Sequence, residues 1–104
     1  MRMTIEGTLL RNPEYRRTLD DRAVVIYVID SKIGIPVEAR VTLDDHVEAA
    51  RLARDARKGD TCEAIGCGAL PRVDHDLAVL TLQRVRSLFV RGSRVFSFAQ
   101  SCTL

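Results

Sequence analysis

The chain has 104 residues, which is enough for one domain around one hydrophobic core and too few for a large multi-domain enzyme. Hydrophobic residues make up 46% of the chain, charged residues 29% and aromatic residues 5%, and the formal net charge is +2. This composition is typical of soluble globular proteins and excludes disordered, fibrous and membrane-embedded chains.

The sequence also bears on location and domain organisation. No apolar run approaches the roughly 20 residues that cross a bilayer, and residues 1–6 carry no apolar signal region. With three cysteines and no export signal, we expect reduced thiols in the cytoplasm. No repeat or linker interrupts the sequence, so we expect a single domain over residues 1–104. Its core is expected over about 3–90, and residues 91–104 form a C-terminal extension or an extra strand.

Three strands are predicted in the first half of the chain. Residues 3–11 alternate apolar and polar side chains, and Gly7 within them marks a bend or bulge. After a polar stretch of turns over residues 11–22, residues 23–29 form a β-branched run, which predicts a strand buried on both faces. Residues 37–43 alternate again, as in a strand with one polar face.

A helix is predicted after the third strand. Asp44 or Asp45 is the expected first residue, since Asp45 and Glu48 have the spacing of a capping box. Leu52 and several alanines recur at helical spacing, and Gly59 is the expected C-terminal cap. Because most of its apolar positions are alanine, the helix buries little area. We therefore expect it to close one end of the sheet rather than to form a core of its own.

Two further strands are predicted over residues 61–69 and 77–86, joined by residues 70–76, and residues 95–99 could extend the sheet. The order is then three strands, a helix and two strands. An all-β, five-stranded Greek-key barrel with one capping helix between strands 3 and 4 is the OB-fold arrangement. Its binding face is formed by the second and third strands with the loops between strands 1 and 2 and strands 4 and 5.

Local sequence resembles one family with this fold. Residues 7–18 read Gly-Thr-Leu-Leu-Arg-Asn-Pro-Glu-Tyr-Arg-Arg-Thr, and residues 23–27 continue as Ala-Val-Val-Ile-Tyr. Residues 40–43 follow as Arg-Val-Thr-Leu, and an Arg-Lys-Gly to Ile-Gly element lies over residues 57–66. This series resembles the bacterial single-stranded-DNA-binding protein superfamily, which includes relatives such as primosomal replication protein N. The resemblance covers roughly residues 3–86.

The resemblance implies an OB-fold protein of replication or recombination that binds single-stranded DNA without strong sequence preference, as a homodimer or homotetramer. Members of the family stack bases on tryptophans, but this chain has none, and Glu38 stands where the third strand carries a tryptophan in the family. We therefore expect binding to depend more on arginine and phosphate than on base stacking.

The candidate binding residues are cations with one aromatic residue among them. Arginine outnumbers lysine 14 to 2, and its planar fork suits phosphates and base faces. An aromatic ring between cations could stack a base while the arginines bind phosphates. The predicted nucleic-acid-binding residues are Arg11, Tyr15, Arg16, Arg17, Lys32, Arg40, Arg72, Arg84 and Arg86.

Other interpretations of these residues stay open. The arginines of residues 11–22 could pair with neighbouring acids on a solvated turn, and Arg84 and Arg86 could pair with acids on another subunit. The chain would then be an OB-fold protein-interaction or assembly module that has lost DNA binding. RNA is an alternative ligand, because the same groove chemistry serves either sugar.

No motif predicts an enzyme, a cofactor or a metal site. Cys62 and Cys67 are five positions apart on a predicted strand and point to opposite faces, with no second cysteine pair or nearby histidine to complete a zinc site. Tyr27 lies in an apolar strand and is predicted to be a core residue.

Overall fold

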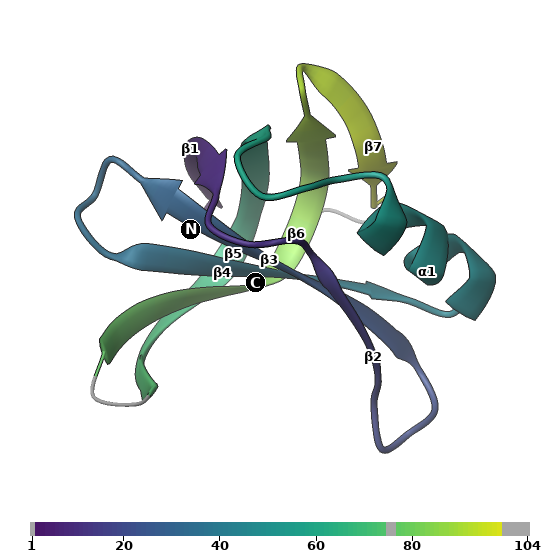
Figure 1. Ribbon diagram of the computed structural model, residues 1–104. Helices are drawn as coiled ribbons and strands as arrows, with labels where there is room; N and C mark the ends of the chain where they lie inside the picture. Colours follow the sequence, from purple (N-terminus) through teal and green to yellow (C-terminus); the bar gives the residue numbers. More distant parts are fainter. Residues whose placement is uncertain (1, 75–76, 99–104) are drawn as a thin grey trace.

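A computed structural model describes residues 2–74 and 77–98, with side chains described outside residues 72–77. The described part contains seven strands and one helix, shown in Figure 1. In chain order they are β1 (Arg2–Leu9), β2 (Glu14–Arg17), β3 (Ala23–Ser31), β4 (Pro36–Leu43), α1 (His46–Arg54), β5 (Thr61–Asp74), β6 (Leu77–Val90) and β7 (Ser93–Ser97). The prediction of a mostly-β domain with one helix after residues 37–43 is confirmed.

Five strands form a closed ring of hydrogen-bonded neighbours. β1 pairs with β5, β5 with β6, β6 with β4, β4 with β3, and β3 returns to β1. β4 and β6 run parallel, whereas the other pairs in the ring are antiparallel. β2 is added beside β3, and β7 is added beside β6.

β1 can pair with both β5 and β3 because Gly7 lies at the crossing. Gly7 is in register with Cys62 of β5 and with Ser31 of β3. A Cβ atom added to Gly7 would lie 2.0 Å from the carbonyl oxygen of Asp30, so only glycine fits there. The bend or bulge predicted at this glycine is a close approach of two strands.

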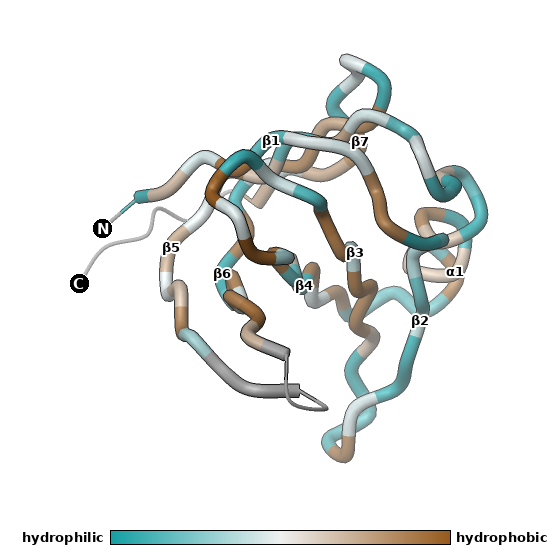
Figure 2. Tube along the Cα trace, turned by 60° about the vertical axis from the view of Figure 1, so that its left-hand side comes forward, coloured by the Kyte–Doolittle hydropathy of each residue, from teal (hydrophilic) through white to brown (hydrophobic). Residues whose placement is uncertain are grey.

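The core lies inside the ring, and β3 contributes to it along its whole length. Val25, Tyr27 and Ile29 are fully buried in the core, which confirms the prediction for Tyr27. Val24 and Ile26 alternate with them and are also buried, so residues 23–29 are covered on both faces as predicted. Figure 2 shows β3 as a largely apolar tube, whereas the turn between β2 and β3 is mostly polar.

α1 begins as predicted but ends earlier. The Asp45 carboxylate caps the helix by accepting from the backbone N–H groups of Val47 and Glu48, at 3.0 and 3.2 Å. The helix ends at Arg54 rather than at Gly59, because the chain turns at Asp55 to bury Ala56. Gly59, with φ of +91°, belongs to the separate turn that leads into β5.

Two stretches predicted as turns or loops are strands. The sequence predicts a loop over residues 70–76 between two strands, but β5 and β6 pair as far as Asp74 and Leu77. This long hairpin and the β2–β3 hairpin reach downward on opposite sides of the molecule in Figure 1. Within residues 11–22, β2 pairs with β3, which puts Tyr15, Arg16 and Arg17 on a strand. β2 is held in place by its hydrogen bonds to β3, so it forms a strand although its own β propensity is weak.

The end of the described chain is β7, which confirms that a further segment extends the sheet. It spans Ser93–Ser97, a little before the predicted 95–99, and residue 99 lies outside the described residues. No helix in the described ranges is long and apolar enough to span a membrane.

Candidate nucleic-acid interface

The outward surface of β2, β3 and β4 brings charged and apolar side chains together. We call it the β2–β4 face and define it by Glu14, Arg16, Val24, Ile26, Glu38 and Arg40. Residues in register on adjacent strands present their side chains on the same side of a sheet. Arg16 is opposite Val24, while Ile26 lies between Glu14 on one side and Arg40 on the other.

The centre of the β2–β4 face is apolar and nearly covered. Val24 is 7% exposed and Ile26 is 3% exposed, although neither belongs to the core inside the ring. Long charged residues of β2 and β4 flank them in register, and the aliphatic stems of such side chains can cover apolar neighbours. The face therefore consists of an apolar strip with an arginine on each side.

Each arginine of the face has an acidic partner two residues before it on the same strand. Arg16 Nη2 lies 3.0 Å from Glu14 Oε2, and both side chains are about half exposed. This hydrogen bond lowers the pKa of the Glu14 carboxyl and raises that of the Arg16 guanidinium. Arg40 Nε donates to Glu38 Oε1 at 2.7 Å, and Glu38 is buried. The Glu38 charge is a smaller cause of the raised pKa of Arg16, as expected when both share a surface.

Two other predicted residues lie near the edge of the face. Arg11 follows β1 and is exposed, and its charge contributes to the lowered pKa of Glu14. Arg17 alternates with Arg16 on β2 and lies opposite Ala23, a core residue, so it leaves the strand on the other side. Its guanidinium is 3.4 Å from the Asp21 carboxylate in the adjoining turn.

Tyr15 points away from the β2–β4 face. It lies opposite Val25 and packs against the core, and its hydroxyl is 2.6 Å from Nδ1 of His46. The two rings meet edge to face, with centroids 6.0 Å apart. His46 Nε2 also lies 2.8 Å from the Asp21 carbonyl oxygen. This chain of contacts ties β2 to α1 and to the β2–β3 turn, so Tyr15 is a structural link in this conformation.

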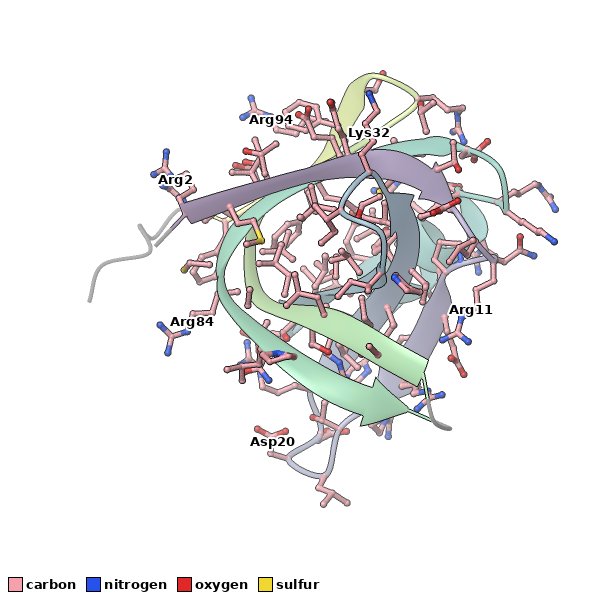
Figure 3. All side chains as sticks on the ribbon, turned by 90° about the vertical axis from the view of Figure 1, so that its left-hand side faces the viewer. Arg2, Arg11, Asp20, Lys32, Arg84 and Arg94 are labelled. Atoms are coloured by element: carbon pink, nitrogen blue, oxygen red, sulfur yellow. The ribbon has the colours of Figure 1, made fainter. Side chains whose placement is uncertain are left out.

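The remaining predicted residues are dispersed. Figure 3 shows Arg11, Lys32 and Arg84 pointing outward on different sides of the molecule. Lys32 is in the β3–β4 turn and lines a shallow hollow with residues of β1 and β5, and Arg84 lies over Gly68 of β5. Arg86 is half-buried at a bulge in β6, where its carbonyl accepts from the Phe98 N–H at 2.7 Å. The Arg72 side chain lies outside the described residues.

Of the eight predicted residues whose side chains are described, the structure thus brings Arg16 and Arg40 together, with Arg11 nearby. The sequence reasoning did not include Val24, Ile26 or Glu14 in the site. The sequence does contain a feature that points to them. A strand that is buried on both faces needs side chains to cover its outer face, and charged residues two positions apart on a neighbouring strand can cover it.

The described residues contain no group of three or more histidine, cysteine, aspartate or glutamate side chains placed to hold a metal ion. Cys62 belongs to the core and Cys67 is buried outside it, so the two thiols do lie on different sides of β5.

Comparison with protein-family models finds no match for this chain, and comparison with curated protein sequences finds none either.

Proposed function

We propose that this chain is a cytoplasmic OB-fold protein that binds single-stranded DNA, without strong sequence preference, on the β2–β4 face. The observation that carries the proposal is the apolar strip of β3 flanked by Arg16 and Arg40 from two different strands. The ring order supports it as well, because a helix between the third and fourth ring strands and a parallel closing pair are typical of the OB-fold.

The ion pair of Arg16 leaves it available for a phosphate. The side chains of Arg16 and Glu14 are 57% and 44% exposed, and exposed ion pairs of this kind contribute little to the stability of a protein. A phosphate can replace the carboxylate at little cost and releases counterions from the nucleic acid as it binds. Arg11 and Arg16 would then follow the backbone across the β2–β4 face. RNA could occupy the same face.

The alternative proposal is an OB-fold interaction or assembly module that has lost DNA binding. The pairing of Arg16 with Glu14 and of Arg40 with Glu38 favours it, because the four charges sum to zero. In either case we propose a homodimer or homotetramer. Its support is that β2 and β7 each pair with one neighbour in the described chain, and unpaired strand edges are docking sites for another strand.

Fluorescence anisotropy of labelled oligo-dT, titrated at low and at physiological salt, tests the first proposal. Duplex of equal length is the competitor control. We expect binding that prefers the single strand and weakens steeply with salt. Arg16→Ala should weaken binding and reduce the salt slope by about one, as loss of one phosphate contact does.

Arg94→Ala is the matched control, because Arg94 is an exposed arginine on β7, which Figure 3 shows far from the β2–β3 turn marked by Asp20. It should leave affinity and slope unchanged. Equal losses in both variants would point to a general charge effect instead of a site. No binding even at low salt would leave the interaction module as the function to pursue.

A further inference from the structure

We infer that Arg40, held in place by Glu38, contacts a nucleobase rather than a phosphate, and that it gives the β2–β4 face a preference for cytosine and guanine over thymine and adenine. The inference rests on the proposed binding of single strands. It assigns different roles to the two arginines of the face, Arg16 to the backbone and Arg40 to a base.

The first step is the geometry of the Arg40 guanidinium. Its Nε donates to Glu38 Oε1 at 2.7 Å, and the side chain is 35% exposed while that of Glu38 is 6% exposed. Because Nε is engaged by a buried carboxylate, a ligand would be bound through the two terminal nitrogens. A guanidinium fixed in this way presents two parallel N–H donors with a defined direction.

The second step is the charge and polarity around Arg40. The Glu38 carboxylate is buried, lies 2.7 Å from the Arg40 Nε and offsets the charge of that guanidinium. Ile26 lies opposite Arg40 and is 3% exposed, and Val28 lies opposite Glu38. A phosphate would therefore meet a guanidinium whose charge is already offset and an apolar neighbour. A neutral base meets neither penalty, whereas Arg16, whose partner is exposed, suits a phosphate.

A further polar group lies beside the pair. Thr81 of β6 is in register with Glu38 and is 4% exposed, and its hydroxyl has no hydrogen-bond partner in the described chain. Buried polar groups are nearly always satisfied, so this hydroxyl is unusual, but its oxygen is covered and offers a ligand no contact in this conformation. What a ligand meets here is an apolar neighbourhood with one ordered guanidinium, which suits the edge of a base.

The third step is the match between two parallel donors and the edges of unpaired bases. Guanine presents O6 and N7 as adjacent acceptors, and unpaired cytosine presents N3 and O2. Thymine places an N–H donor between its two carbonyl oxygens, and adenine places an amino donor beside each ring acceptor on that side. Only the first two bases accept both arginine N–H groups, and a good bidentate contact discriminates by a factor of ten or more, roughly.

The test compares oligo-dC with oligo-dT of equal length, about 15 nucleotides, by anisotropy at mildly alkaline pH and constant salt. The wild type should bind oligo-dC about tenfold tighter. Arg40→Lys keeps the charge but not the fork, so the ratio should fall to about one while oligo-dT affinity stays within about twofold. Arg94→Lys is the matched control and should keep the ratio.

Glu38→Gln gives a second and distinctive outcome. Without the carboxylate, Arg40 becomes available to phosphates, so oligo-dT affinity should rise and the salt slope should steepen by about one while the dC preference falls. A purely structural role for Glu38 would instead lower both affinities together. Thermal melting checks that each variant is folded. If Glu38→Gln does not fold, the oligo-dC to oligo-dT ratio of Arg40→Lys alone decides whether Arg40 contacts a base.

Two results would overturn the inference, and they are distinguishable. Equal affinity of the wild type for oligo-dC and oligo-dT, with tight binding of both, would make Arg40 a phosphate contact and leave the proposed function standing. Failure to bind either oligonucleotide at low salt would overturn both the inference and the proposed function.

Discussion

Tyr27 is a fully buried tyrosine whose hydroxyl has no hydrogen-bond partner among the residues described. Burial raises the pKa of this phenol well above its ordinary value, so the group is neutral at any physiological pH. An unpaired buried hydroxyl has lost its water without gaining a partner, and such a loss costs about 1–3 kcal/mol. The ring itself fills the core.

Tyr27→Phe should therefore raise the free energy of unfolding, by about 1 kcal/mol, because it removes the hydroxyl and keeps the ring. Urea denaturation followed by circular dichroism measures this. Tyr27→Ala is the contrasting variant and should lower the free energy by about 3–5 kcal/mol through the cavity it leaves. A loss of stability in Tyr27→Phe would mean that the hydroxyl has a partner in solution.

At the residue scale, the sequence predicted Tyr27 correctly but could not separate neighbours on β2. Tyr15, Arg16 and Arg17 were grouped because they are consecutive and polar or aromatic. On a strand, consecutive side chains leave on opposite faces, so Arg16 joins the β2–β4 face while Tyr15 meets His46 and Arg17 meets Asp21. Without the pairing of β2 to β3, the stretch has no faces to assign.

Among the elements, α1 depends on acids at its start and arginines at its end. Asp45 caps it, and Glu48 forms a bidentate pair with Arg51, whose Nε is 3.0 Å from Oε2. Arg51 also reaches Asp55 at 2.9 Å. The hydrogen bond from Arg51 lowers the pKa of Glu48 below its ordinary 4.5. Hydrogen bonds also lower the pKa of Glu14, through Arg16, and the pKa of Asp20, through the Thr18 hydroxyl.

These lowered values predict how stability changes in acid. A carboxyl whose pKa is lowered in the folded state binds a proton more readily in the unfolded state. Its contribution to the free energy of unfolding is therefore complete at pH values above 4.5 and is lost as the pH falls through the folded-state pKa. Thermal melting should show a midpoint that falls as the pH drops below 4.5. Glu48→Gln should make this fall shallower, and an unchanged acid profile would show that the pair contributes nothing in solution.

At the scale of elements, periodicity located the strands that have one or two buried faces, such as β3 and β4. It missed β2 and the outer half of the β5–β6 hairpin, because their backbone is held by pairing more than by side-chain pattern. The sequence assigns Pro71 to the connection over residues 70–76, yet it lies within β5, in register with Leu80. Pairing partners are a tertiary property that local propensity does not contain.

For the molecule as a whole, the ring strands have neighbours on both sides, while β2 and β7 each have one in the described ranges. Native-state hydrogen exchange should reflect this difference. Amides of β3 and β6 should exchange most slowly, and those on the outer edges of β2 and β7 most quickly, because slow exchange requires opening of the whole ring.

Measuring exchange at low and at high protein concentration also tests the proposed oligomer. If a second copy pairs with one of these edges, its amides should become protected as the concentration rises. If the exchange rates of the β2 and β7 edge amides do not change with protein concentration, assembly through these strands is contradicted.

The way the ring closes also determines when the fold can form. Residues 2–8 pair with residues 61–67, and residues 37–39 pair in parallel with residues 80–82, so closure joins parts of the chain that are far apart in sequence. Contacts of this kind slow folding, because the ordering of long intervening segments precedes the gain from pairing. A nascent chain that has exposed β1 to β4 but not β6 presents the apolar inner side of β3 with no closed ring to cover it. Native structure is therefore expected only after β6 has been synthesised, and until then the emerging chain is a substrate for chaperones that bind extended apolar strands.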